Sequence, residues 1–117
     1  MSHITAPELA LWQAQAFDFQ LLDVRRAGLR QQQGLQIIGA RWLDPATWLD
    51  WKDSISAQTP VVVYCAKGHE IGQGLSATLR ALGVDARYLV DGFQGWQEQG
   101  RALEALPPNV GAHASAA

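Results

Sequence analysis

A short β-branched run, a glycine-rich turn and a helical pattern follow one another in the middle of this chain. Residues 60–65 read Pro-Val-Val-Val-Tyr-Cys, which is typical of a buried strand. Leu75, Leu79 and Leu82 then recur at the period of an amphipathic helix, with Ile71 in phase. Because parallel sheets are built from strands that alternate with helices, this segment predicts an α/β fold.

The remaining sequence repeats the alternation. Further strands are predicted at residues 19–24, 35–43 and 86–90. Helices are predicted after Thr5, after Asp44-Pro45 and between Gly92 and Gln99, with a short helix or loop at 25–33. This order predicts a mainly parallel central sheet of about five strands with helices on both faces.

The composition fits one globular domain, predicted at residues 1–106, with a flexible tail at 107–117. A net charge of −2 gives no basic face for nucleic acid, and no apolar stretch approaches the roughly 20 residues of a membrane span. The chain shows no secretory signal, and its single cysteine excludes an internal disulfide. We therefore expect a cytoplasmic protein that binds neither nucleic acid nor membrane.

Cys65, the single cysteine, has two interpretations. A buried thiol at the end of a strand is often part of the hydrophobic core. However, Gly68, Gly72 and Gly74 follow within ten residues, and glycine-rich turns before a helix direct backbone N–H groups toward an anion. Such surroundings also favour the thiolate over the thiol. The combination favours a nucleophile.

Topology predicts which other polar groups lie near Cys65. The carboxyl ends of parallel strands share one edge of a sheet, where α/β proteins bind ligands. Asp23 and Arg25 follow one predicted strand, and Asp91 follows another. Asp23 and Arg25 are interpreted as a buried structural ion pair, whereas Arg26 and Arg30 are expected on a solvated face together with Arg25.

Four motifs in register resemble the rhodanese-like domains, the single-domain sulfurtransferases. Leu22-Asp23-Val24-Arg25 is similar to that family's Asp-x-Arg motif, and residues 35–40 are similar to its Gly-His-Ile-x-Gly-Ala stretch. Residues 60–68 resemble the strand with a Cys-x-x-Gly loop, and residues 90–96 resemble the closing Gly-Gly-x-x-x-Trp segment. The resemblance covers about residues 5–104 in the family's order.

The resemblance implies a rhodanese-like fold and a Cys65 that carries a sulfane sulfur as a persulfide. The donor would be thiosulfate or a similar small molecule, and the acceptor cyanide, a thiol or a protein. The implied substrate-binding loop consists of Ala66, Lys67, Gly68, His69, Glu70 and Ile71, with Asp23 and Arg25 in support. No cofactor is implied. A metal site at Cys65 and His69 is not expected, because two ligands without further Cys or His do not hold zinc.

The chain also departs from the family pattern. Leu35 and Gln36 replace the Gly-His pair, and Arg30 stands near the place of an acidic residue that would form an ion pair. Glu70 either faces the sulfur and repels it, or points outward and stabilises the first helical turn, which we favour. His69 is interpreted equally well as a proton donor or as a solvent-facing side chain.

The aromatic side chains carry one further alternative. Trp42, Trp48, Trp51 and Trp96 are expected in the core, although any of them, with Phe93, would also suit the mouth of a pocket. For function, the alternatives to a sulfurtransferase are a non-catalytic binding or sensing module and a cysteine-based phosphatase or arsenate reductase. The six-residue loop from Cys65 to Glu70 disfavours the phosphatase, since that branch of the family has a longer loop with an arginine.

Overall fold

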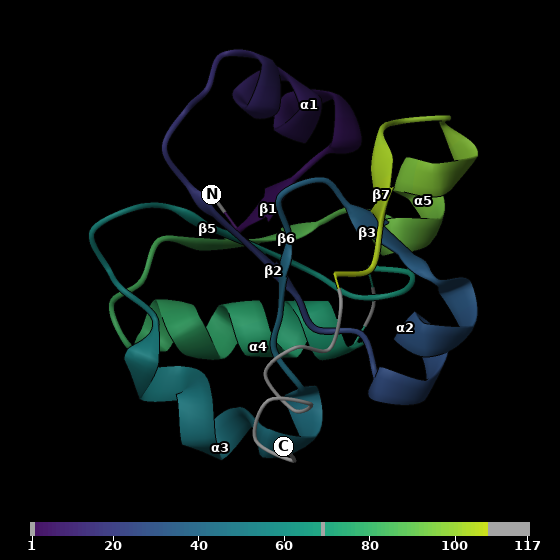
Figure 1. Ribbon diagram of the computed structural model, residues 1–117. Coiled ribbons are helices and arrows are strands. Elements are labelled where there is room, and N and C mark those ends of the chain that lie inside the picture. Colours follow the sequence, from purple (N-terminus) through teal and green to yellow (C-terminus); the bar gives the residue numbers. More distant parts are fainter. Residues whose placement is uncertain (1, 69, 108–117) are drawn as a thin grey trace.

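A parallel sheet forms the centre of the computed structural model, which describes residues 2–68 and 70–107 (Figure 1). Within these residues the sheet has five strands in the order β1-β6-β5-β2-β4, and every neighbouring pair is parallel. The strands are β1 (His3–Ile4), β2 (Gln20–Asp23), β4 (Arg41–Trp42), β5 (Val61–Tyr64) and β6 (Ala86–Leu89). The predicted mainly parallel α/β fold is confirmed.

Both faces of the sheet are covered by helices, as predicted (Figure 1). Val62 and Tyr64 of β5 pack with α1 (Ala6–Ala14) and α5 (Gly92–Glu98). Val61 and Val63 point the other way, toward α3 (Trp48–Trp51) and α4 (Glu70–Ala81). Because side chains alternate along a strand, Cys65 continues the second series and lies on the α4 side.

The central strand is also the most deeply buried one. All four residues of β5 are fully buried, and they pair with β2 on one side and with β6 on the other. A strand in this position reads as an unbroken apolar run instead of an alternating one. The Val-Val-Val-Tyr sequence therefore predicted both the strand and its central place.

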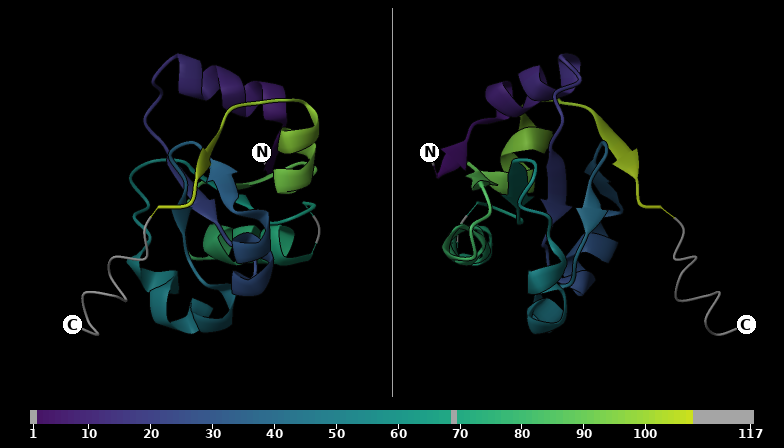
Figure 2. Two further views of the ribbon diagram at one scale, coloured as in Figure 1. Left: turned by 45° about the vertical axis from the view of Figure 1, so that its right-hand side comes forward. Right: turned by 90° about the vertical axis from the view of Figure 1, so that its left-hand side faces the viewer.

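A second, smaller sheet was not predicted. β3 (Leu35–Ile37) pairs antiparallel with β7 (Leu103–Ala105) on the outside of the molecule (Figure 2). The strand β1 was not predicted either, since two residues carry no recognisable alternation. Residues 108–117, most of the predicted tail, lie outside the described residues.

Two predicted elements needed correction. The helix predicted after Asp44 is broken into the 3₁₀ turn η1 (Pro45–Thr47), α3 and the 3₁₀ turn η2 (Lys52–Ser54), and Leu49 is 71% exposed. Leu82 was expected on the buried face of the central helix but is 47% exposed, because α4 ends at Ala81. The other leucines of that pattern face the sheet, with Leu79 fully buried.

The tryptophans divide between core and rim. Trp51 and Trp96 are buried, as expected, and Phe93 is fully buried with them. Trp42 and Trp48 are only partly buried.

Candidate active site

Cys65 stands directly after β5, where the sheet meets the first turn of α4. The residue is only 5% exposed, and no hydrogen bond between described residues uses the thiol. The sulfur approaches α4 so closely that a Cβ atom at Gly72 would lie 3.2 Å from Sγ. Gly72 therefore makes the room in which the sulfur sits.

The loop after Cys65 turns its carbonyl oxygens toward α5. The Phe93 amide donates to the Cys65 carbonyl at 2.9 Å, and the Gln94 amide donates to the Ala66 carbonyl at 2.8 Å. In a trans peptide unit the N–H points opposite to the C=O. The N–H groups of Ala66 and Lys67 therefore point away from α5, and no hydrogen bond between described residues uses either of them. Backbone amides without a partner in the protein attract anions.

Two glycines hold this loop against the start of α5. Gly68 has a φ of +75°, and a Cβ there would lie 2.6 Å from the Asp91 amide nitrogen. Gly92 has a φ of +55°, and a Cβ there would lie 2.5 Å from the Cys65 carbonyl oxygen. Since any side chain would force the two backbones apart, these glycines fix the loop by close approach.

A pocket of about 410 Å³ opens beside the thiol. Its walls come from the loop, from the first turn of α4 and from the segment around the start of α2 (Ala27–Gln33). The lining residues are Arg25, Arg26, Leu29, Cys65, Ala66, Lys67, Glu70 and Ile71. The exposed side chains bring two positive charges, from Arg26 and Lys67, and one negative charge, from Glu70.

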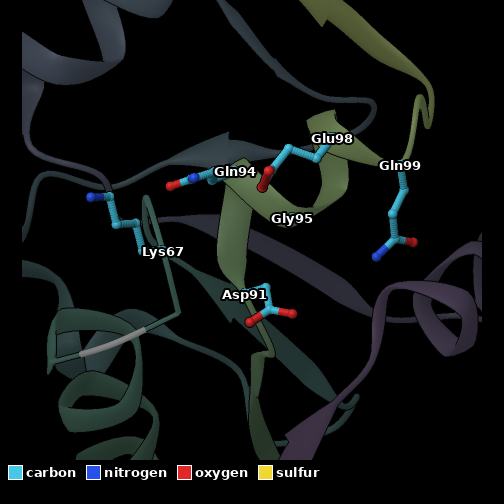
Figure 3. Close-up of a pocket in the computed structure, with 6 residues that line it drawn as sticks. All are labelled: Lys67, Asp91, Gln94, Gly95, Glu98 and Gln99. Atoms are coloured by element: carbon cyan, nitrogen blue, oxygen red, sulfur yellow. The ribbon is translucent and has the colours of Figure 1, made fainter.

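Lys67 stands between this pocket and another one against α5. Figure 3 shows that second pocket, in which the lysine side chain extends away from the carboxylates of Asp91 and Glu98. No ion pair between described residues involves Lys67. Its positive charge is therefore not neutralised by α5 and remains at the mouth of the Cys65 pocket.

Arg25 is held in a hydrogen-bonded network next to the same pocket. Its guanidinium donates to both Asp23 carboxylate oxygens, with Nε to Oδ1 at 3.0 Å and Nη2 to Oδ2 at 2.7 Å. The remaining donors reach Gln33 Oε1 at 2.7 Å and the Leu35 carbonyl at 2.8 Å. The charged group also lies 4.1 Å from the centre of the Phe93 ring. We refer to Asp23, Arg25, Gln33 and Leu35 as the Arg25 network.

The Arg25 network confirms the predicted buried ion pair and corrects the predicted solvated face. Both side chains of the pair are fully buried, so Arg25 does not belong to a solvated surface. Arg30 does not either, because its Nε lies 3.5 Å from Asp23 Oδ2 and its guanidinium lies 4.9 Å from the Trp42 ring centre. Only Arg26 is exposed as expected.

Gln36, one of the departures from the resembled motif, is fully integrated into the fold. Its amide donates to the Ala40 carbonyl at 3.0 Å and to Glu104 Oε2 at 2.8 Å. Glu104 belongs to β7, so this bond ties the small sheet together. Arg30 donates to Gln36 Oε1 at 3.3 Å. A glutamine at this place thus has a structural role.

Tyr64 connects the Arg25 network with the small sheet. The Ile37 amide donates to its phenolic oxygen at 3.2 Å, and the ring stacks on Phe93. Burial raises the pKa of Tyr64 far above its ordinary value, and the nearby Asp23 carboxylate raises it further. The phenol is therefore neutral throughout the physiological range.

A family model for the Rhodanese-like domain matches residues 5–99. The chain belongs to the rhodanese-like domain family. No curated protein matches it significantly.

Solved structures of other proteins, two of them described as rhodanese-like or rhodanese-related, share the fold. A rhodanese-like domain protein from Staphylococcus aureus is 25% identical, with a TM-score of 0.77 over 92% of this chain and 100% of that one. A rhodanese-related protein from Thermoplasma volcanium is 19% identical, with a TM-score of 0.77 over 89% and 98%. A Rhodopseudomonas palustris protein of unknown function, described as a possible tyrosine phosphatase, is 22% identical, with a TM-score of 0.75 over 89% and 85%.

The structure of this rhodanese-like chain brings most of the predicted site residues together. Cys65, Ala66, Lys67, Glu70, Ile71 and Arg25 line one pocket. Gly68 instead supports the loop from behind, and Asp23 acts on the pocket only through Arg25. His69 lies outside the described residues.

Glu70 is exposed, at the first residue of α4. This position agrees with the favoured outward role in the first helical turn. The residue nevertheless borders the Cys65 pocket, so its charge acts on any anion that binds there. Among the described residues it makes no ion pair.

Two lining residues were not predicted, Arg26 and Leu29. They belong to the cap and first turn of α2, which was expected as a short helix or loop without a role at the site. The alternative that tryptophans or Phe93 line the mouth is wrong for the pocket residues that the structure describes. Among residues 2–68 and 70–107, no three His, Cys, Asp or Glu side chains come together as a metal site, and no helix is long and apolar enough to cross a membrane.

Proposed function

We propose that this rhodanese-like chain is a sulfurtransferase in which Cys65 carries a sulfane sulfur as a persulfide. The observation that carries the proposal is the placement of the thiol. The sulfur lies beside a pocket that holds Arg26 and Lys67, at the start of a loop whose first two amides point away from α5. Thiosulfate, sulfite and a persulfide are all anions, and such surroundings attract them.

The proposed reaction is a double displacement. The Cys65 thiolate attacks the outer sulfur of thiosulfate, a new S–S bond forms, and the bonding pair of the donor leaves with sulfite. Cyanide or a thiol then attacks the outer sulfur of the persulfide, and the electron pair returns to Cys65. The sum of the two steps neither oxidises nor reduces the protein, so no cofactor is needed.

Two sequence features support sulfur transfer over phosphate hydrolysis. The loop from Cys65 to Glu70 has six residues, and no arginine occurs between Cys65 and Arg80. Lysine is a point charge, whereas arginine offers the planar fork that suits phosphate oxygens. The Rhodopseudomonas palustris relative is described as a possible tyrosine phosphatase, so phosphatase activity should also be assayed. We expect no turnover of an aryl phosphate.

Glu70 supports the second candidate, a non-catalytic binding or sensing module. Its carboxylate borders the pocket and opposes the attraction of Arg26 and Lys67 for an anion. In a binding module the thiol would form no persulfide with any sulfane donor. For either function the single cysteine suits a reducing compartment, so we propose a cytoplasmic location.

Thiocyanate formation from thiosulfate and cyanide tests the proposal. Wild type should turn over, and Cys65→Ser, which replaces only the sulfur atom, should fall to the background rate. Circular dichroism of the variant controls for folding. Activity retained in Cys65→Ser would end the proposal, and a folded wild type that is inactive with every sulfane donor would favour the binding module.

A further inference from the structure

Another pocket, of about 470 Å³ and distinct from the one shown in Figure 3, continues from the Cys65 pocket along α4. The two pockets share Arg26, Glu70 and Ile71. The 470 Å³ pocket extends to Gly74 and Leu75 of α4 and to the turn at residues 44–46. We call the two pockets together the α4 groove.

The α4 groove is shallow. Its walls include residues that are themselves exposed to solvent, at the start of α2, on α4 and in the 44–46 turn. These are Arg26, Ala27, Ala46, Glu70 and Gly74. Small-molecule sites bury most of the ligand surface, which a channel of this kind does not do. An open channel instead fits a polypeptide segment, one side of which stays in water.

The charges of the groove are divided along its length. At the Cys65 end, the two cations Lys67 and Arg26 outnumber the carboxylate of Glu70, which lines both pockets. Farther along, the carboxylates of Glu70 and Asp44 outnumber the single guanidinium of Arg26. No ion pair between described residues joins any of these four groups. An occupant that matches this pattern is anionic near Cys65 and cationic along α4.

The groove extends along α4 by about one helical turn beyond the residues that it shares with the Cys65 pocket. Gly74 and Leu75 lie one helical turn beyond Glu70 and Ile71, which is about 5.4 Å along the axis. An extended chain covers that distance in about two residues. The floor between the charged walls is apolar, from Ile71, Leu75 and Pro45, and suits an aliphatic side chain.

We propose that the α4 groove binds the sulfur acceptor, an extended polypeptide segment with a cysteine and a basic residue about two positions away. The inference rests on the proposed sulfur transfer through Cys65. It adds that the acceptor is a protein thiol recognised along α4, with the thiol held near Lys67 and the basic side chain near Glu70 and Asp44.

The transfer step balances as a thiol exchange. The acceptor thiol gives up its proton as its sulfur bonds to the outer sulfur of the Cys65 persulfide. The S–S bond to Cys65 breaks, and its electron pair returns to Cys65, which takes up the proton. The products are the acceptor persulfide and the free enzyme thiol, and no oxidant or reductant is consumed.

Gly74 offers a selective way to fill the groove. A Cβ at Gly74 would meet nothing within 4 Å, so Gly74→Trp adds its ring to the groove without a backbone clash. Gly28 of α2 is also a helical glycine with open space around it, and it lines neither pocket. Gly28→Trp is therefore the matched control.

The experiment follows persulfide transfer from thiosulfate-loaded enzyme to two acetylated, amidated peptides, Lys-Ala-Cys-Ala-Lys and Glu-Ala-Cys-Ala-Glu, and to cyanide. Alkylation and mass spectrometry measure the peptide persulfide. For Gly74→Trp we expect the rate with the lysine peptide to fall at least tenfold relative to the rate with cyanide. Gly28→Trp should leave that ratio unchanged. Comparing variants on one peptide cancels the intrinsic reactivity of its thiol.

A second variant tests the charge pattern without adding bulk. Glu70→Gln should lower the preference for the lysine over the glutamate peptide about threefold, the size expected for one exposed charge pair. Two results would overturn the inference: an unchanged ratio of lysine-peptide to cyanide rates in Gly74→Trp, or an unchanged preference for the lysine peptide in Glu70→Gln. If transfer to cyanide persists in these variants, the proposed function is unaffected. Failure of wild type to load sulfur or to pass it to cyanide would instead overturn the proposed function itself.

Discussion

The Arg25 network and the Cys65 loop (residues 65–70) lie at the carboxyl ends of neighbouring strands, β2 and β5, but their polar groups are partnered differently. In the network every guanidinium nitrogen of Arg25 has an acceptor, and Asp23 is fully buried against it. In the loop, the thiol of Cys65 and the ammonium of Lys67 have no hydrogen-bond or ion-pair partner among the described residues. Both regions follow from the same parallel topology.

The difference shows that one edge of a sheet can hold both a structural region and a chemical one. A buried charge whose nitrogens are each bonded inside the protein is fixed in place and stabilises the fold. A nucleophile and a cation without internal partners remain available to a substrate. Position at the carboxyl edge brought both regions together, and the completeness of their bonding distinguishes a structural role from a chemical one.

The largest expected effect comes from breaking the Arg25 network. Arg25→Ala leaves the Asp23 carboxylate buried without its main partner, and we expect it to lower the free energy of unfolding by about 3–5 kcal/mol. Arg26→Ala, at the exposed neighbour, should change it by less than about 0.5 kcal/mol. Chemical denaturation of both variants makes the comparison. Equal losses would contradict a structural role that is specific to Arg25.

Tyr64→Phe is expected to have the next largest effect. It removes the acceptor of the Ile37 amide, which costs about 1–3 kcal/mol at neutral pH. The variant also tests the raised pKa of Tyr64. Because the folded state keeps this proton above about pH 10, where the unfolded phenol loses it, wild-type stability should fall there by about 1.4 kcal/mol per pH unit.

The raised pKa of Tyr64 predicts the direction in which stability changes with pH. The contribution of Tyr64 is fully present below the pKa of the unfolded phenol and is lost as the pH rises above it. Tyr64→Phe should lack this decline, so the curves of wild type and variant should converge between about pH 10 and pH 11. Curves that stay parallel over this range would show that Tyr64 titrates alike in both states.

Gly72→Ala tests how closely the Cys65 sulfur fits against α4. The new Cβ would lie 3.2 Å from Cys65 Sγ, so the sulfur must shift by a few tenths of an ångström. We expect sulfur transfer to fall about tenfold, whereas the helix gains up to about 1 kcal/mol from alanine. Thiocyanate assays and denaturation measure the two effects. Gly28→Ala is the control, and equal activity in both variants would contradict the close fit of the thiol.

The smallest expected effect is that of Lys67→Gln. It removes one exposed cation from the pocket mouth and should raise the KM for thiosulfate about two- to fivefold, with little change in stability. Added salt should narrow the difference between wild type and variant, because it screens exposed charges. Lys52→Gln, at a lysine that pairs with Asp53, is the control. A KM change that does not depend on salt would contradict an electrostatic role.

Sequence patterns predicted the parts of the fold whose signals are local. The buried β5 run and the period of α4 are properties of consecutive residues, and both were found. The strands β1 and β7 exist because β6 and β3 lie beside them, and segments of two or three residues carry no periodicity. The segment that is broken into η1, α3 and η2 also contains a hydrogen bond from the Trp51 indole to the Asp44 carbonyl, a contact that periodicity does not report.

The candidate site divides in the same way. The Cys65 loop is one continuous segment, so its residues were recognisable from the sequence. The close approach of Gly68 to Asp91 and of Gly72 to the sulfur depends on packing and was not predicted. Arg26 was assigned only to a solvated face, because its approach to the thiol depends on how α2 packs against the loop. Gln36 was recognised as a departure, but its partner Glu104 lies 68 residues away and no local pattern connects them.

The most direct test of the whole account is the intact mass of the protein after incubation with thiosulfate, with and without a cyanide chase. Wild type should gain the mass of about one sulfur atom and lose it to cyanide, and Cys65→Ser should gain nothing. Such a result would place the sulfur on the one thiol that has no internal partner. An unchanged wild-type mass with every sulfane donor, or an equal gain in Cys65→Ser, would contradict the account.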